Sequence, residues 1–209
     1  MKQLVIIGAG GMGRSLYDLA RDSWGYGIKF NIKGFIDDNL QAMDGFKNYP
    51  PLLGKIETYI PQENDCFISS IGGDSRKHCT ELILQRGGDF LTLIHQTARI
   101  GTNAKLGKGN IIAAYSNIGA DATIGDYNMI QSYSIIGHDA VIGNWNRIDT
   151  HVTCIGGVWI GNEVTVHTSA VLNHKVVVED KAHIGACSFV IRKVLAGTTV
   201  IGNPAKRLL

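Results

Sequence analysis

A glycine-rich segment near the N-terminus contains the first residues whose types and spacing could do chemistry. Gly8-Ala9-Gly10-Gly11-Met12-Gly13 follows the apolar run 4–7 and matches the GxGxxG pattern. Between a strand and a helix, such a turn lets backbone N–H groups and the helix N-terminus approach a phosphate. The alternative is a turn that only packs the helix on the strand. We expect nucleotide binding, with substrate contacts at Gly8, Gly10, Gly11, Met12 and Gly13.

Two aspartates and a second glycine extend this candidate site. Asp37 and Asp38 follow a strand predicted over 32–36, where a ribose or base would lie, although a solvated turn would also explain them. Gly72 follows a strand predicted over 66–71 and is a further expected substrate contact.

These elements must be positioned by a small α/β domain. Helices are predicted over 15–21 and 76–86, and a further strand over 90–94, so residues 1–95 are interpreted as a Rossmann-like domain. It has too few strands for a full dinucleotide-binding fold, which favours a mononucleotide. An NAD-dependent oxidoreductase, suggested only by GxGxxG, would leave the second half of the chain unexplained.

The second half carries an aliphatic residue at every sixth position. The series begins at Ile100, Leu106 and Ile112 and ends at Val190, and only Cys154 in it is not aliphatic. Glycine often follows the aliphatic residue, and the fifth position of each hexad is mostly small or β-branched. This period is typical of a parallel β-helix, in which three hexads form one triangular coil. We expect five coils, inward aliphatic columns, and glycines where turns bend tightly or take positive φ.

His138 and Asp139 form a polar pair outside the aliphatic column. His138 occupies the third hexad position, so its side chain should project from the coil. Histidine suits general base catalysis because its ordinary pKa of about 6.5 lies near working pH. The alternative is a surface histidine that only lines an interface.

Composition excludes several other classes of protein. The formal net charge is +2 and the basic residues are spread along the chain, which argues against nucleic acid binding. No apolar run is long enough to cross a membrane, and Met1-Lys2-Gln3 leads directly into a strand, so we expect neither membrane insertion nor a signal peptide. The cysteines lack CxxC spacing, which favours reduced thiols in a cytoplasmic protein and predicts no metal. They are Cys66, Cys79, Cys154 and Cys187.

Two segments of the repeat half, together with GAGGMG, resemble a known family. Residues 136–143 read Ile-Gly-His-Asp-Ala-Val-Ile-Gly and residues 201–207 read Ile-Gly-Asn-Pro-Ala-Lys-Arg. Over nearly its whole length the chain resembles the NeuD/PglD-type sugar O-/N-acyltransferases. The resemblance implies an all-β, left-handed parallel β-helix over 96–209 and a homotrimer with active sites between subunits. It further implies His138 as general base, Asp139 as its support, and a nucleotide sugar held by the N-terminal domain.

The resemblance also implies where acetyl-CoA, the acyl donor, would lie. The pantetheine arm would follow the last coils and the C-terminal segment would meet the CoA phosphates, unless its charges are only a solvated tail. The turns near Gly143 or Gly156 could supply a backbone N–H for the oxyanion. The expected contacts are Gly143, Ile155, Gly156, Ala186, Gly202, Pro204 and Lys206.

The sequence departs from the family at one turn. Arg147 stands where some amino-sugar members have a second histidine, and Asp149-Thr150-His151 replaces small residues or Pro-Gly. Arg147 and His151 are nevertheless expected substrate contacts. Three other histidines are expected to stack or to cap turns: His167, His174 and His183.

The function expected is acetyl-CoA-dependent N-acetylation of a nucleotide-linked amino sugar. A UDP-4-amino-4,6-dideoxy sugar for surface glycan synthesis is the first choice, with direct attack on the thioester. Sialic acid O-acetylation is the alternative acceptor chemistry. A zinc-dependent γ-type carbonic anhydrase is another class, because His138 and His174 lie two coils apart, although Glu179 stands where its third histidine would be. A non-catalytic assembly protein is disfavoured by the projecting His138.

Overall fold

The computed structural model describes residues 1–73 and 75–208 and divides into two compact units. Met1–Leu93 forms the first unit and Ile94–Leu209 the second. The two units differ in architecture, because both of the described helices belong to the first and the second consists of short strands and turns.

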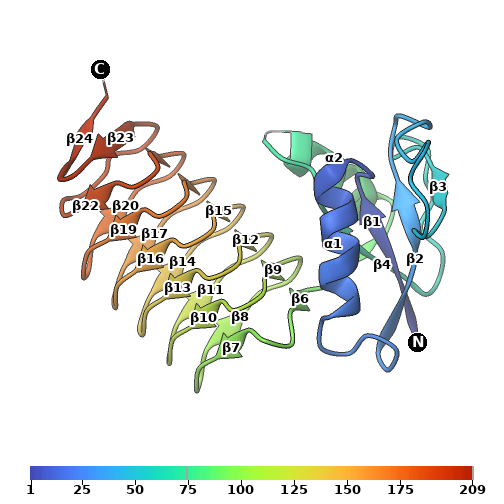
Figure 1. The fold of residues 1–209 in the computed structure, drawn as a ribbon, viewed down its shortest axis with the longest axis horizontal. Coiled ribbons are helices and arrows are strands. Elements are labelled where there is room, and N and C mark those ends of the chain that lie inside the picture. Colours follow the sequence, from blue (N-terminus) through green and yellow to red (C-terminus); the bar gives the residue numbers. More distant parts are fainter. Residues whose placement is uncertain (74, 209) are drawn as a thin grey trace. The chain divides into compact units, whose positions relative to one another are not determined.

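The first unit is an α/β domain built on a five-stranded parallel sheet (Figure 1). The strand order is β3-β2-β1-β4-β5. Strands 4–7 and 66–68 are fully buried and apolar, as expected for central strands of a parallel sheet. The strands are β1 (Lys2–Ile7), β2 (Phe30–Ile36), β3 (Leu52–Gly54), β4 (Asp65–Ser69) and β5 (Asp89–Phe90), and the helices are α1 (Gly11–Arg21) and α2 (Ser75–Gln85).

Three details of this domain differ from the sequence prediction. Helix α1 begins at Gly11 rather than Ser15, because its first turn lies within the glycine motif. Strand β3 was not predicted; it is short and pairs only with the end of β2. The single strand predicted over 90–94 is wrong. The chain leaves one sheet at β5 and enters the β-helix at β6 (Leu93–Ile94), which pairs with a strand of the second unit.

The second unit is a parallel β-helix, as the hexad repeat predicted (Figure 1). One six-stranded face has the order β22-β19-β16-β13-β10-β7, and a five-stranded face has β20-β17-β14-β11-β8. The third, eight-stranded face has β24-β23-β21-β18-β15-β12-β9-β6. The strands are β7 (Arg99–Ile100), β8 (Lys105–Leu106), β9 (Ile111–Ile112), β10 (Asn117–Ile118), β11 (Thr123–Ile124), β12 (Met129–Ile130), β13 (Ile135–Ile136), β14 (Val141–Ile142), β15 (Arg147–Ile148), β16 (Thr153–Cys154), β17 (Trp159–Ile160), β18 (Thr165–Val166), β19 (Val171–Leu172), β20 (Val177–Val178), β21 (His183–Ile184), β22 (Phe189–Val190), β23 (Thr199–Gly202) and β24 (Ala205–Arg207).

Each inward aliphatic residue pairs with its equivalent one coil later. Ile118 is the partner of Ile136, and Ile136 is the partner of Cys154. These residues are fully buried, so every coil adds three side chains to one continuous apolar core. The core also contains a polar column that the sequence analysis did not predict, formed by the buried Asn110, Asn128 and Asn146.

The glycines of the repeat serve close approach between coils rather than positive φ. A Cβ on Gly119 would lie 2.5 Å from the backbone nitrogen of His138, and one on Gly137 would lie 2.5 Å from that of Gly156. Neither glycine has positive φ. The left-handed conformation instead falls two residues later, mostly on residues other than glycine, including Asp139 (φ 56°) and His151 (φ 62°). Positive φ is therefore found at turn glycines such as Gly109 and Gly157, and not at the glycines that directly follow the aliphatic residues.

The hexad frame ends at Val190. Val194, rather than residue 196, forms the bridge to Val178, so this step is two residues shorter than the others. Strand β23 then pairs with β21, and the antiparallel pair β23–β24 closes the end of the β-helix. Within the part of the chain that is described, no helix is long and apolar enough to cross a membrane.

Candidate functional site

His138 and Asp139 lie at one corner of the triangular coil. This His138 corner consists of residues 137–140, between β13 and β14, and the equivalent turns 119–122 and 155–158. His138 Nδ1 lies 2.6 Å from Asp139 Oδ2, and the two side chains are 65% and 66% exposed. Because a carboxylate can only accept, the Nδ1–H donates to Asp139 and leaves the lone pair on Nε2. The pair therefore presents a basic nitrogen to the surface of the coil.

Gly156 lies directly against the His138 ring. A Cβ on Gly156 would clash with Nε2 and would lie 2.6 Å from Cε1. Glycine is thus required here for the imidazole to rest on the backbone of the next coil. The Gly157 N–H donates to the His138 carbonyl at 2.8 Å and ties the two turns together.

The backbone N–H groups near His138 differ in whether they are already used. The Gly143 N–H donates to the Ile160 carbonyl at 2.8 Å, so it is committed to the β-helix ladder. The Gly156 N–H donates to none of the described residues. Of the two turns expected to supply an oxyanion donor, only that of Gly156 offers such a group beside His138.

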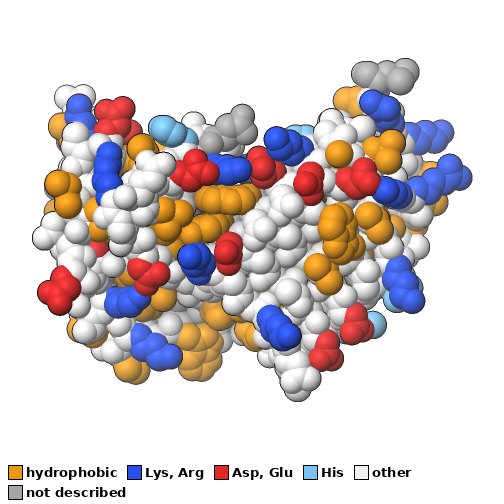
Figure 2. Space-filling view, turned by 180° about the vertical axis from the view of Figure 1, so that it is seen from behind, with side chains coloured by type: hydrophobic (Ala, Val, Ile, Leu, Met, Phe, Trp, Pro, Cys, Tyr) orange, Lys and Arg blue, Asp and Glu red, His pale blue; other side chains and the backbone are white. Residues whose placement is uncertain are grey.

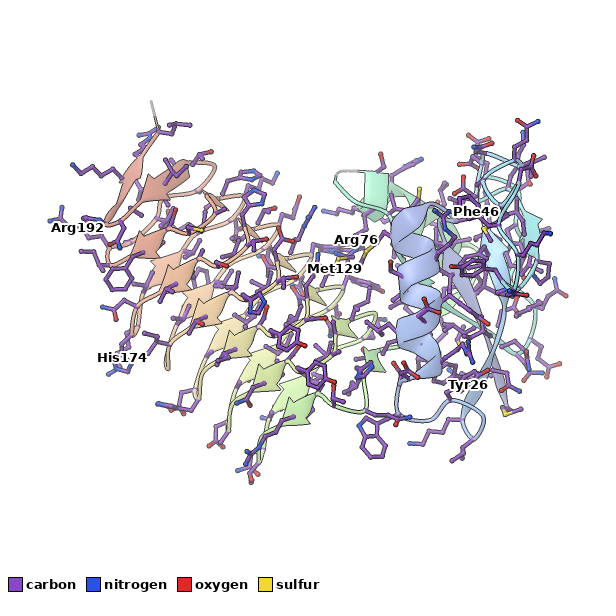
Figure 3. The ribbon with its side chains drawn as sticks, viewed as in Figure 1. Tyr26, Phe46, Arg76, Met129, His174 and Arg192 are labelled. Carbon is purple, nitrogen blue, oxygen red and sulfur yellow. The ribbon has the colours of Figure 1, made fainter. Side chains whose placement is uncertain are left out.

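One of the expected CoA contacts at the C-terminus, Lys206, lines a basic cavity of about 320 Å³. Its floor is apolar and includes Val194 and Val200, while Lys206 lies on its wall with three more cations. Figure 2 shows Lys and Arg side chains gathered at this end of the β-helix. Lys193 is paired with Glu179 at 2.6 Å. The remaining wall cations are Arg192, which Figure 3 labels, and Arg207.

The other expected CoA contacts do not line this cavity. Gly202 and Pro204 lie at the turn of the β23–β24 hairpin, where the Gly202 N–H donates to Ser188 Oγ at 3.1 Å. Ile155 is exposed beside Gly156, whereas Ala186 follows β21 at a different corner. The structure therefore places Ile155 and Gly156 at the His138 corner and Gly202, Pro204 and Lys206 at the C-terminal hairpin, with Ala186 and Gly143 at other corners.

Glu179, which stands where a carbonic anhydrase would have its third histidine, is bonded to protein groups. Its carboxylate accepts from Lys193 and, at 3.0 Å, from the Ala196 N–H, and the Lys193 hydrogen bond lowers the pKa of Glu179. Among the described residues, no group of three or more His, Cys, Asp or Glu is arranged to hold a metal ion.

In the first unit the glycine turn is held by packing and by Asp37. Gly8 has φ 95°, and a Cβ on Gly13 would collide with the Gly8 carbonyl, so the turn and α1 are in close contact. Asp37 Oδ2 accepts from the Ala9 N–H at 2.8 Å, and its other oxygen accepts from the Asn39 N–H. Both oxygens of Asp37 are thus bonded to backbone.

The start of α1 is open to a ligand. Gly10 is its N-cap without a side-chain hydrogen bond, and no acidic residue lies in the first turn. Gly10 and Gly72 have open space where a Cβ would stand, and a Cβ on Gly11 would lie 3.9 Å from Arg14 Nη2. Asp38 accepts from the Glu57 N–H at 3.2 Å. The helix N-terminus therefore keeps its positive end available to an anion.

The chain shows matches to two protein families and to curated relatives. Residues 3–81 match the PglD N-terminal domain, and residues 91–184 match the GMPPB C-terminal domain. UDP-N-acetylbacillosamine N-acetyltransferase from Bacillus subtilis (strain 168) is 29% identical over 121 residues, 54% of this chain and 52% of that protein. The match thus spans about half the length of that relative. The acetyltransferase domain of PglB from Neisseria gonorrhoeae FA1090 is 27% identical, covers 100% of both chains and has a TM-score of 0.89.

The chain is thus similar, in both of its units, to the PglD-type sugar acetyltransferases. The resemblance drawn from GAGGMG, the IGHDAVIG segment and the C-terminal IGNPAKR is confirmed. PerB from Caulobacter crescentus, 22% identical with a TM-score of 0.88 over 100% of this chain and 98% of that chain, has the same fold.

Two features near the predicted contacts were missed in the sequence analysis. Arg14 donates to the Ala9 carbonyl and places its guanidinium 3.6 Å from the centre of the Phe46 ring, beside the glycine turn. Its position four residues after Gly10, on the first turns of α1, was the available signal. The second feature is the buried carboxylate of Asp149 beside Arg147. His151, in contrast, stacks on Tyr133 with 5.0 Å between ring centres.

Proposed function

We propose that this chain transfers an acetyl group from acetyl-CoA to the amine of a nucleotide-linked amino sugar. The curated relative from Bacillus subtilis is named for acetyl transfer of this kind, and the Neisseria PglB domain is known in complex with acetyl coenzyme A. The observation that carries the proposal is the His138–Asp139 pair, with Nε2 resting against Gly156.

The His138 corner has the groups that the reaction needs. As the neutral amine nitrogen bonds to the acetyl carbon, His138 Nε2 accepts the proton that the amine loses. Asp139 stabilises the resulting imidazolium through Nδ1. The Gly156 N–H donates to the carbonyl oxygen as that oxygen becomes negative. When the bond from the acetyl carbon to sulfur breaks, His138 returns the proton to the leaving thiolate.

The chain also has places suited to both substrates. The basic cavity at the β23–β24 hairpin, with Lys206 on its wall, fits the phosphates of CoA. The pantetheine arm would reach His138 along Ile155, and Ala186, Gly202 and Pro204 stay proposed contacts. In the N-terminal domain, proposed to span 1–95, the open start of α1 fits a phosphate of the nucleotide.

For the acceptor we propose a UDP-4-amino-4,6-dideoxy sugar, by analogy with the named substrate of the Bacillus subtilis relative. Its N-acetyl product would serve surface glycan synthesis. We further propose that the chain acts as a homotrimer, with each active site shared between neighbouring β-helices.

Release of free thiol from acetyl-CoA tests this function. Purified protein is assayed with UDP-4-amino sugars, CMP-sialic acid and free sialic acid. Thiol release that depends on an amino sugar supports the proposal. Release only with a sialic acid would move the reaction to O-acetylation and overturn the acceptor. No release from a folded protein with any of these acceptors would overturn acetyl transfer to them.

A further inference from the structure

A second corner of the β-helix carries polar side chains where the repeat usually has glycine. This Asp149 corner consists of residues 131–134, 149–152 and 167–170, between the faces of β15 and β16. Directly after the inward aliphatic residue, three successive coils have Gln131, Asp149 and His167. The corresponding positions at the His138 corner are glycines in two coils of three, at Gly119 and Gly137.

Asp149 is the buried centre of this group. Its side chain is only 8% exposed. Oδ1 accepts from Arg147 Nε at 2.6 Å and from Gln131 Nε2 at 3.1 Å. Oδ2 lies 3.2 Å from Nδ1 of His167, so His167 contacts an acid rather than stacking or capping a turn as expected. A buried carboxylate needs such partners, because an unpaired one would be very costly.

The hydrogen bonds to Asp149 determine which nitrogen atoms of Arg147 and His167 are left to contact a ligand. Arg147 uses Nε and keeps both terminal nitrogens, and its side chain is 48% exposed. His167 uses Nδ1 and keeps Nε2, and its side chain is 43% exposed. The half-exposed guanidinium of Arg147 is therefore held by a buried anchor. Its two terminal nitrogens are the donors that remain, because a His167 ring whose Nδ1–H donates to Asp149 has a lone pair on Nε2. The planar end of an arginine held in this way matches the two oxygens of a carboxylate or phosphate.

We propose that Arg147 forms an oxyanion site that binds a phosphate or carboxylate of the acceptor substrate, with Asp149 as the positioning residue. The assignment to the acceptor rests on the proposed function. In one chain the site lies at a different corner from His138. Within one chain the site therefore shares no residue with the His138–Asp139 pair, and it selects the acceptor by its negative charge.

The test measures binding of two probes by calorimetry, without turnover. UDP carries phosphates and no carboxylate, whereas free sialic acid carries a carboxylate and no phosphate. Each is titrated into wild type, Arg147→Gln and Arg99→Gln, the last being an exposed arginine on β7 at another face. We expect one probe to bind roughly 10- to 100-fold more weakly to Arg147→Gln and unchanged to Arg99→Gln. The affected probe identifies the source of the oxyanion.

Two further variants separate positioning from a merely structural effect. Arg147→Lys keeps the charge but loses the planar fork, so it should recover only part of the binding. Asp149→Asn keeps the size of the side chain and should weaken the same probe, with melting curves to show that the variant is folded. Equal loss of both probes' binding in Arg99→Gln would overturn the proposal, because the effect would then be one of net charge.

Other results would also overturn the site. These are binding of neither probe by wild type, or unchanged binding of both by Arg147→Gln. Dissociation of an oligomer in Arg147→Gln with unchanged probe binding would mean that Arg147 pairs with a second copy of the chain. Absence of thiol release in wild type, in contrast, would overturn the proposed reaction while the binding result still decided the oxyanion site.

Discussion

At one corner of the β-helix a side-chain oxygen caps a backbone N–H in each coil, whereas at the His138 corner the corresponding N–H groups are left uncapped. The first is the asparagine corner, formed by residues 125–128, 143–146 and 161–164. There the Asp126 N–H donates to Asn144 Oδ1 at 2.7 Å, and the Asn144 N–H donates to Asn162 Oδ1 at 2.9 Å. At the His138 corner the N–H groups of Ala120, His138 and Gly156 donate to none of the described residues.

The asparagine corner also has a second set of hydrogen bonds, made by buried asparagine side chains. Asn128 Oδ1 accepts from the Asn146 N–H at 2.9 Å, while the Asn146 amide donates to the Gly161 carbonyl and its oxygen accepts from the Val164 N–H. One backbone geometry therefore serves two purposes. At the asparagine corner the side-chain ladder ties successive coils together. At the His138 corner that ladder is missing, and this is where we propose that the substrate binds.

The largest effect is expected from His138→Ala. Loss of the general base should lower kcat/KM for acetyl transfer by about 100- to 10,000-fold. The melting temperature should stay close to that of wild type, because the His138 side chain is exposed. Steady-state thiol release and thermal melting measure the two quantities. A variant that keeps more than a third of wild-type activity would exclude His138 as the base.

Gly156→Ala tests whether the His138 corner needs its glycine. The new Cβ would occupy the place of the imidazole and displace Nε2, so kcat should fall by roughly 100-fold. The double variant with His138→Ala should be no worse than His138→Ala alone, because both changes remove the same base. Full additivity of the two losses would show that Gly156 acts independently of His138.

Asn146→Ala changes the asparagine corner and should lower the stability of the protein rather than its catalytic rate. It leaves the buried Val164 N–H and the Gly161 carbonyl without their partners, which costs about 2–4 kcal/mol. Chemical denaturation measures the free energy of unfolding. Thiol release by the fraction still folded should match that of wild type. Asn144→Ala, on the outer ladder, is the matched control and should cost about 1 kcal/mol.

Asp65→Asn tests a stabilising contact of the first unit. There the carboxylate of Asp65 is buried and forms an ion pair with Lys33, in contrast to the side-chain ladders of the β-helix. Burial alone would raise the pKa of Asp65, but hydrogen bonds from Lys33, the Gln62 N–H and Tyr59 lower it below its usual value. A lowered folded pKa gives stability above about pH 4 that is lost as the pH falls through the folded pKa. The variant should be less stable than wild type at pH 7 by about 1–3 kcal/mol. The difference in free energy of unfolding between wild type and the variant should become smaller below pH 4. A difference that grew in acid would contradict a lowered pKa of Asp65.

The smallest effect concerns thiol reactivity. Burial raises the pKa of Cys154 to about 12 and that of Cys66 to about 11, and Cys79 is also buried with a raised pKa. Cys187 is exposed at a turn. In native protein at pH 8, a thiol reagent should modify Cys187 quickly and the others only after unfolding, and Cys187→Ser should abolish the fast phase. Fast reaction of Cys154 would mean that the reagent reaches the core of the β-helix, where Cys154 lies between inward aliphatic residues.

The difference between the two corners also shows what the sequence could reveal. A six-residue period fixes the inward residues, so Ile118, Ile136 and Cys154 could be assigned to one column from their spacing alone. The same spacing, applied to polar residues, would have revealed Asn110, Asn128 and Asn146, because equivalents lie one coil apart. Gln131, Asp149 and His167 carry the same signal at another corner.

Other features depend on contacts that no local pattern records. The fit of the His138 ring against Gly156 is set by the stacking of two coils, and glycine alone does not show whether it serves a turn or a neighbour. Asp37 follows a strand, as predicted, yet only the structure shows that both its oxygens hold the backbone. The shortened step between Val190 and Val194 depends on how the last coil closes, which the hexad frame could not predict.

The most direct test of acetyl transfer through His138 is to identify the product by mass spectrometry in the same reaction that releases thiol. Wild type, His138→Ala and Asn144→Ala are incubated with acetyl-CoA and a UDP-4-amino-4,6-dideoxy sugar. We predict that wild type and Asn144→Ala add one acetyl group to the sugar nitrogen, with one free thiol formed per product, and that His138→Ala forms almost none. Equal product from His138→Ala and wild type, or thiol release without an acetylated sugar, would contradict this mechanism.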